Sequence, residues 1–181
     1  MEINMKTLLV VDMQNDFIDG ALGTPEAVKI VPNVKKKIEE YEARGDQIFF
    51  TRDTHQDYYL ETHEGKNLPV VHCIEGTEGW QIPEDLDIKN AHYLDKCSFG
   101  WICWNLLRVD GDWVLRNLGD EIEVIGLCTD ICVVSNALIL RSFYPETDII
   151  VDASCCAGTT PEMHRKALDI MKSCQIKVIN E

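Results

Sequence analysis

Continuous apolar stretches alternate with amphipathic stretches along almost the whole chain. The apolar runs at residues 7–12, 47–52 and 122–127 are typical of buried parallel strands, because such strands are covered on both faces. Apolar positions at helical spacing predict a helix over 25–43, with Gly45 just past its end. This alternation of strands and helices predicts an α/β fold.

The alternation continues to the end of the chain. A helix is predicted from Asp130, its N-cap, to Ser142, and another over 161–173, which begins with proline. Further short strands are predicted at 91–94, 148–152 and 176–179. Five or six mostly parallel strands joined by right-handed crossovers make a three-layer α/β/α domain, and no linker or repeat divides residues 1–181.

Three segments lack this regular pattern. Residues 13–20 are interpreted as a loop, and residues 101–114 as a helix broken at Asp110 and Gly111. The longest irregular segment, 53–82, contains three of the five histidines. Since a loop of that length inside a compact domain is usually functional, this segment is expected to contribute to a site.

Composition and charge narrow the range of partners. The chain has 181 residues, of which 31 are acidic and 17 basic, for a formal net charge of −14. Nucleic acids and anionic membrane surfaces would repel such a chain, which leaves a small molecule or a protein as partner. No apolar run approaches the roughly 20 residues of a membrane span, and residues 1–6 are too short and too polar for a signal peptide. We therefore expect a cytoplasmic protein.

The eight cysteines are expected to be reduced. They are irregularly spaced and mostly lie in apolar segments, unlike those of a small secreted disulfide scaffold. Cys128 and Cys132 are not a zinc-ribbon pair, because no second pair follows at matching spacing.

Cys132 is the candidate nucleophile. It follows the apolar run 122–127 and lies in the first turn of the helix expected from Asp130, where the helix dipole lowers the pKa of a thiol. However, a cysteine in an apolar strand–helix unit is more often a small buried hydrophobic residue. The assignment therefore needs support from other residues.

That support comes from two residues at other strand ends. Asp12 ends the first expected strand, and Lys96 follows the strand at 91–94. Alone, each has an ordinary interpretation, Asp12 as a cap and Lys96 as a solvated charge. Because the carboxyl ends of parallel strands line one ligand crevice, Asp12, Lys96 and Cys132 are expected to lie together there, which favours a catalytic site.

The long irregular segment begins at the same edge and offers metal ligands. Asp53 and His55 are two residues apart on an extended chain, so their side chains point the same way, and His72 could return to them. A carboxylate with imidazoles suits zinc, manganese or ferrous iron. Glu64 and His63 compete for a further ligand position. The alternative is a set of histidines exposed on a loop.

Six sequence stretches carry a family resemblance. They are VVDMQNDF, TRDTH, HCIEGTEGW, KCSFG, GLCTDICV and DASCCAG, in this order over nearly the whole chain. Together they resemble the isochorismatase-like cysteine hydrolase superfamily, and within it most closely the nicotinamidases and pyrazinamidases. The resemblance implies that Asp12, Lys96 and Cys132 are the catalytic residues. It also implies that Asp53, His55 and His72 bind a metal ion, with Glu64 a ligand or water-holder in some relatives. Isochorismatases proper lack this metal set.

The resemblance also implies a reaction. A thioester on Cys132 would form during hydrolysis of a small amide, most simply nicotinamide, with Lys96 favouring the thiolate and Asp12 transferring the proton. The family's oxyanion donors correspond to the backbone N–H groups of Cys128 and Cys132, with a cis peptide bond before Cys128. Phe17 matches a contact to the substrate ring.

Other consequences of the resemblance are less specific. Some nicotinamidases have tryptophan three residues before the last histidine, where this chain has Pro69. Family members commonly self-associate, so a homo-oligomer is expected. Two other functions stay open, namely metal-independent hydrolysis of another amide, carbamoyl or ureido substrate, and a non-catalytic binding module.

Overall fold

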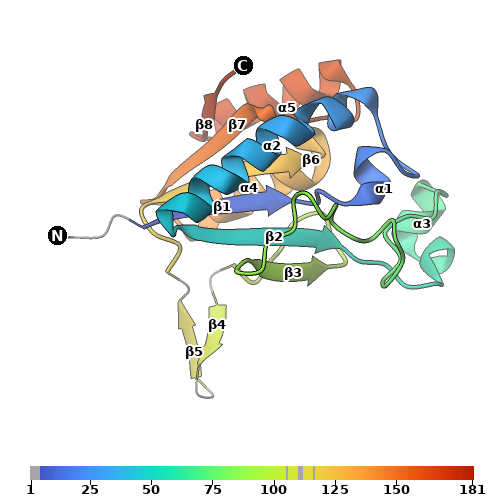
Figure 1. Ribbon diagram of the computed structural model, residues 1–181, viewed down its shortest axis with the longest axis horizontal. Coiled ribbons are helices and arrows are strands. Elements are labelled where there is room, and N and C mark those ends of the chain that lie inside the picture. The colour runs from blue at the N-terminus through green and yellow to red at the C-terminus, as the bar shows by residue number, and fades with distance from the viewer. Residues whose placement is uncertain (1–4, 105, 110–111, 116) are drawn as a thin grey trace.

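A six-stranded parallel sheet is the centre of the computed structural model, which describes residues 5–104, 106–109, 112–115 and 117–181 (Figure 1). The strand order is β3-β2-β1-β6-β7-β8. The order reverses between β1 and β6, the position at which open α/β sheets bind ligands. The strands are β1 (Lys6–Val11), β2 (Gln47–Asp53), β3 (His92–Lys96), β6 (Glu121–Leu127), β7 (Asp148–Ala157) and β8 (Lys177–Ile179).

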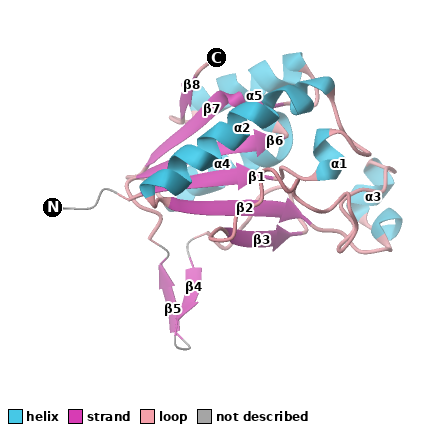
Figure 2. Ribbon diagram, viewed as in Figure 1, coloured by secondary structure: helices cyan, strands magenta, loops and turns pink. Residues whose placement is uncertain are grey.

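Helices lie on both sides of this sheet and complete the three-layer α/β/α fold predicted from the sequence (Figure 2). One side is covered by α2 (Pro25–Arg44), and the other by α4 (Val134–Phe143) and α5 (Pro161–Ser173). Thr24 caps the start of α2, and Gly45 ends it in the left-handed conformation, as the sequence predicts. No helix in the described part of the chain is long and apolar enough to cross a bilayer.

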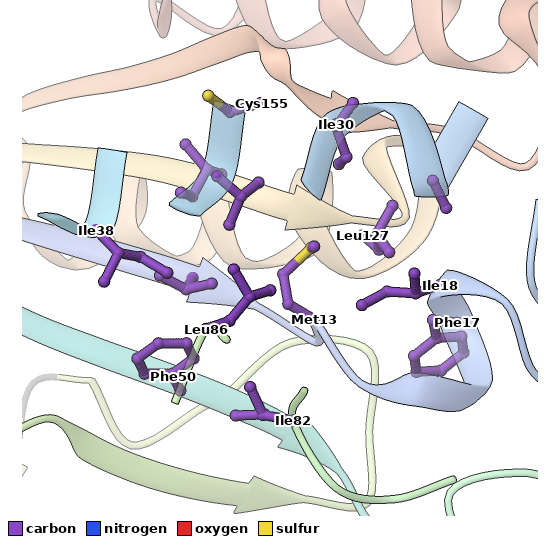
Figure 3. Packing of buried hydrophobic residues seen from close by; sticks show 14 of the residues in the cluster. Met13, Phe17, Ile18, Ile30, Ile38, Phe50, Ile82, Leu86, Leu127 and Cys155 are labelled. Atoms are coloured by element: carbon purple, nitrogen blue, oxygen red, sulfur yellow. The ribbon is translucent and has the colours of Figure 1, made fainter. Parts of the chain in front are cut away.

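Alternate side chains of β1 point into two separate hydrophobic cores. Leu8 and Val10 pack in the core under α2, whereas Leu9 and Val11 pack in the core under α4 and α5. Figure 3 shows the first core, with Ile30 and other side chains of α2 over residues of the sheet and of the loop after β1. The continuous apolar run in β1 therefore follows from the cover on both faces.

The irregular segments contain short helices that the sequence analysis did not predict. α1 (Asn15–Ile18) lies in the segment interpreted as a loop, and η1 (Tyr59–Glu61) and α3 (His63–Asn67) lie in the long irregular segment. Each is too short to produce a helical period in the sequence.

The helix predicted over residues 101–114 is wrong. β4 (Leu106–Val109) and β5 (Asp112–Leu115) form an antiparallel hairpin that projects from the body of the protein (Figure 1). The predicted break at Asp110 and Gly111 lies outside the described residues. Several residues of the segment are strand-formers, so strand propensity predicts this hairpin better than helical spacing does.

The N-cap role predicted for Asp130 is also wrong. The chain passes from β6 into α4 through a π-helical turn, η2 (Thr129–Val133), and the Asp130 carboxylate lies inside this turn. It accepts hydrogen bonds from the Thr159 N–H group at 2.8 Å and from the Thr159 hydroxyl at 2.6 Å. Asp130 therefore joins the turn after β6 to the loop after β7.

Candidate active site

Four strand ends bring the predicted site residues to one edge of the sheet. Asp12 follows β1, Asp53 ends β2, and Lys96 ends β3 in register with Asp53. Cys128 follows β6, and Cys132 lies in the turn η2 that comes next. Because these strands are parallel neighbours in the order β3-β2-β1-β6, their carboxyl ends meet.

Lys96 lies between a carboxylate and a thiol. Its Nζ is 2.7 Å from Asp12 Oδ2 and 3.7 Å from Cys132 Sγ. All three residues are buried, with exposed fractions of 0% for Asp12, 3% for Lys96 and 6% for Cys132. The structure thus brings the three residues together in a site shielded from water, where charge interactions are strong.

Asp12 is held in an unusual backbone conformation. Its φ angle is +47°, in the left-handed region, which aspartate tolerates better than most residues. The Asp12 N–H donates to the Thr51 carbonyl at 3.1 Å, and the Thr51 hydroxyl donates to Asp12 Oδ1 at 2.7 Å. These bonds to β2 hold the carboxylate toward Lys96.

Burial disfavours the thiolate form of Cys132. Burial raises the pKa of Cys132 well above its ordinary value, the negative charge of Asp12 adds to the effect, and the Lys96 ammonium opposes it only in part. The sequence-based prediction of a lowered thiol pKa is therefore wrong. Cys132 lies in a buried π-helical turn rather than in the first turn of a regular helix.

Asp12 and Lys96 are also strongly affected by their surroundings. Burial raises the pKa of the Asp12 carboxyl, although the Lys96 charge opposes it. Burial disfavours the ammonium of Lys96, but the negative charges around it, that of Asp12 first among them, outweigh burial and the pKa of Lys96 is raised. Lys96 therefore stays charged, and Asp12 has the affinity for a proton that a proton-transfer group needs.

Four ligand-type side chains lie beside this cluster. Single ligand atoms of Asp53, His55, Glu64 and His72 all lie within 4.8 Å of one another. His55 Nε2 is 3.0 Å from Asp53 Oδ2 and 3.8 Å from Glu64 Oε1. His63, the competing candidate, is exposed at the start of α3 and lies outside this group.

The protonation of this group suits metal binding. His72 Nδ1 donates to the Val70 carbonyl at 2.7 Å, which leaves the Nε2 lone pair directed toward Asp53 Oδ2, 3.6 Å away. Burial would raise the pKa of Asp53, but the hydrogen bond from His55 and the Lys96 charge are among the interactions that hold it below its ordinary range. An ionised carboxylate with imidazole nitrogens fits a divalent ion such as zinc.

Two aromatic rings pack against the histidines. The Tyr59 ring centre is 4.6 Å from that of His55 and 4.9 Å from that of His72. Phe17, the predicted substrate contact, lies 5.5 Å from the His72 ring. The metal group and the catalytic cluster adjoin, since Lys96 Nζ is 3.6 Å from Asp53 Oδ1.

Two supporting residues escaped the sequence analysis. The buried Gln14 side chain donates to the Asp53 carbonyl at 2.8 Å and accepts from the Asp53 N–H at 2.7 Å. The Asp16 carboxylate accepts a hydrogen bond at 2.7 Å from the N–H group of Cys73, the residue that follows His72. Both residues lie in the stretch VVDMQNDF after the first strand, and this position was the only signal in the sequence.

The backbone between β6 and η2 has two unusual features. The peptide bond between Leu127 and Cys128 is cis, as the family resemblance implied. Gly126 has a φ angle of +118°, and a Cβ added there would lie 2.1 Å from the Val11 carbonyl oxygen. Only glycine therefore lets β6 approach β1 here, one residue before Asp12.

Comparison with known sequences gives a match over almost the whole chain. The family model described as Isochorismatase domain matches residues 6–181. The chain is 25% identical over 218 residues to a nicotinamidase of Saccharomyces cerevisiae, covering 98% of this chain and 100% of that protein. It is 30% identical over 186 residues to an Arabidopsis thaliana protein named probable inactive nicotinamidase, covering 94% of this chain and 89% of that protein.

Comparison with solved structures gives the same fold. A pyrazinamidase of Pyrococcus horikoshii in complex with zinc has a TM-score of 0.77 and 27% sequence identity, with 97% of this chain and 99% of that chain covered. An N-carbamoylsarcosine amidase from Thermoplasma acidophilum has a TM-score of 0.74 and 25% identity, with 96% of this chain and 95% of that chain covered. These similarities confirm the fold and the family resemblance inferred from the sequence.

Proposed function

The chain belongs to the isochorismatase family, and we propose that it is a metal-dependent cysteine amidohydrolase that converts nicotinamide to nicotinate and ammonia. One observation carries the proposal. The buried cluster of Asp12, Lys96 and Cys132 adjoins a carboxylate–histidine group, with 3.6 Å between Lys96 Nζ and Asp53 Oδ1. The similarity to named nicotinamidases supports the same reaction.

The catalytic cluster supports acyl transfer through Cys132. Asp12 and Cys132 both lie against the Lys96 ammonium, and Asp12 takes the thiol proton as sulfur bonds to the amide carbon. Asp12 then gives this proton to the departing nitrogen, and the C–N bond breaks to release ammonia. Water, deprotonated by Asp12, hydrolyses the thioester, and the returned proton restores the thiol. Lys96 stabilises the negative charge as it moves between oxygen and sulfur.

The tetrahedral oxyanion needs fixed donors. We assign the backbone N–H groups of Cys128 and Cys132 to this role, as the family resemblance implies. Both residues lie in the segment that turns away from the sheet after β6, next to the attacking sulfur. Donors on a turn of fixed backbone cost no rearrangement during the reaction.

The metal ion would be held by Asp53, His55 and His72, with Glu64 as the fourth protein residue. When bound, the ion would supply a Lewis-acid site for a pyridine nitrogen, so that the carboxamide faces Cys132. Zinc is the ion that the donor set and the zinc-bound relative favour, and iron and manganese also accept these ligands. Phe17, beside His72, would contact the substrate ring.

Zinc affinity should distinguish Glu64 from its neighbour His63. We expect His55→Ala and Glu64→Ala to weaken zinc binding by at least the roughly 10-fold that loss of an outer-shell partner causes. His63→Ala, an exposed change one residue from Glu64, serves as the matched control and should leave affinity unchanged. Competition against a chromophoric zinc chelator measures each dissociation constant. Equal weakening by His63→Ala, or unchanged affinity in His55→Ala, would contradict the assignment.

The substrate is tested by comparing nicotinamide with benzamide, which lacks the ring nitrogen. We expect kcat/KM for ammonia release to be roughly 100-fold or more higher for nicotinamide, because only nicotinamide can bind the metal through its ring. Pyrazinamide, which keeps that nitrogen, should resemble nicotinamide. Removal of the metal should lower kcat/KM for nicotinamide and leave benzamide nearly unaffected. Equal rates for the two amides, or full activity without metal, would overturn the proposal.

A second function is favoured by the similarity to N-carbamoylsarcosine amidase. The same Asp12, Lys96 and Cys132 set would then hydrolyse a carbamoyl or ureido substrate without metal. Ammonia release from N-carbamoylsarcosine by metal-stripped protein, with none from nicotinamide, would identify this function. Release from no amide would point to a binding module, although all three catalytic positions are filled.

Three further predictions rest on the sequence and the family resemblance. They are the homo-oligomeric state, the organisation of residues 1–181 as one domain and the cytoplasmic location. Light scattering, limited proteolysis and cell fractionation test them in turn.

A further inference from the structure

The side-chain amide of Asn136 is fully buried and forms four hydrogen bonds, none of them to the side chains of Asp12, Lys96 or Cys132. It lies in α4, four residues after Cys132, with an exposed fraction of 0%. A carboxamide offers two donors and an acceptor oxygen with two lone pairs, and here all are used. Nδ2 donates to the carbonyls of Cys132 at 2.8 Å and Phe99 at 3.3 Å, and Oδ1 accepts from the Trp101 N–H at 2.9 Å and the Trp104 Nε1–H at 3.2 Å.

These four partners belong to two parts of the chain. Cys132 is the nucleophile of the proposed reaction, and the other three partners lie in residues 97–104, the loop that directly follows Lys96. Lys96 ends β3, at one edge of the sheet, and β2 and β1 separate β3 from β6. The sheet therefore does not pair the strand of the lysine with the strand that leads to the cysteine. The Asn136 side chain links these two parts directly.

The loop backbone also packs closely against side chains of α4. Gly100 is buried, and a Cβ added there would lie 2.4 Å from Ile139 Cδ1 and 3.3 Å from Ser135 Cβ. The Tyr144 hydroxyl, just after α4, donates to the Trp104 carbonyl at 2.7 Å. The loop is thus packed along α4, with the Asn136 bonds at the end nearest Cys132.

We propose that Asn136 is a positioning residue for the proposed reaction, one that keeps Lys96 Nζ close to Cys132 Sγ by binding the loop after Lys96 to the helix after Cys132. The inference rests on the proposed function. Asn136 acts through the loop backbone, and its side chain has no polar valence left for substrate. A carboxamide suits this role because its two donors and its oxygen pair with the two carbonyls and the two N–H groups named above, which would otherwise be buried without those hydrogen bonds.

The test uses Asn136→Ala and Asn136→Ser, with Ser135→Ala as the matched control. The Ser135 hydroxyl donates to the Ile131 carbonyl at 2.6 Å within the same stretch of helix and does not bridge to the loop. Serine at position 136 can bond to the Cys132 carbonyl in the same local way, so it removes chiefly the loop contacts. We expect kcat for nicotinamide to fall roughly 10- to 100-fold in both Asn136 variants, with KM changed by less than about 3-fold, and no change in the control.

A second readout needs no substrate. The rate at which iodoacetamide alkylates Cys132, followed by mass spectrometry, is compared for Asn136→Ser in the natural and in the Lys96→Met background. If Asn136 acts through Lys96, the substitution changes the rate only while Lys96 is present. The same factor in both backgrounds, an unchanged kcat, or an effect confined to KM would overturn the proposal. Dependence on Lys96 in a protein that hydrolyses no nicotinamide would refute the proposed function while supporting the positioning role.

Discussion

Cys132→Ala should abolish ammonia release from nicotinamide. Loss of the nucleophile in a cooperating catalytic set lowers kcat by roughly 10⁴-fold or more, because the remaining residues cannot form the covalent intermediate. The neighbouring Cys128 is not expected to replace it, because Cys132 is the thiol that Lys96 Nζ contacts, at 3.7 Å. The fold should persist, because alanine leaves only a small space in this turn. Single-turnover and steady-state assays with circular dichroism check both expectations.

Cys155→Ala is the matched control for this experiment. Cys155 is as buried as Cys132, but it lies in β7 and packs in the core under α2 (Figure 3). Burial raises its pKa to about 11, so a raised thiol pKa alone does not mark the nucleophile. We expect this variant to keep near-normal kcat. Turnover by Cys132→Ala above about 1% of the unmodified rate would remove Cys132 from its role.

Asp12→Asn should lower kcat by roughly 100-fold or more, with a much smaller effect on KM. Asparagine keeps the size of the side chain and can still accept the hydrogen bond from Thr51, but it cannot hold the proton of the Cys132 thiol. It also leaves the buried Lys96 ammonium without its nearest counter-charge, 2.7 Å away. Steady-state kinetics with nicotinamide separate the two parameters.

Asp19→Asn is the control for the Asp12 variant. Asp19 lies in the same segment after β1 but is exposed and outside the site. It should leave both kcat and KM unchanged. A near-normal kcat in Asp12→Asn would mean that another group transfers the proton, and the proposed roles of Asp12 and Lys96 would have to be revised.

The sequence by itself determined the architecture and the edge of the sheet at which the site lies. An apolar run such as that of β1 requires cover on both faces, which in turn requires helices on both sides of a parallel sheet. Strand ends in such a sheet share an edge, so Asp12, Lys96 and Cys132 could be grouped without coordinates. These inferences depend on local patterns and on one general rule of topology, and both are readable in a single sequence.

Only the tertiary structure decided between Glu64 and His63 as the metal ligand and showed how burial changes the pKa of Cys132. Glu64 and His63 are adjacent, and the turn of α3 directs neighbouring side chains about 100° apart, so one joins the metal group and the other is exposed. The raised pKa of Cys132 results from burial by segments distant in sequence, which a local helix-dipole argument does not include. The hydrogen bonds of Asn136 likewise depend on the loop after Lys96, whose sequence shows no helix or strand periodicity. The conformation of this loop comes from its packing on α4, which a local sequence pattern does not predict.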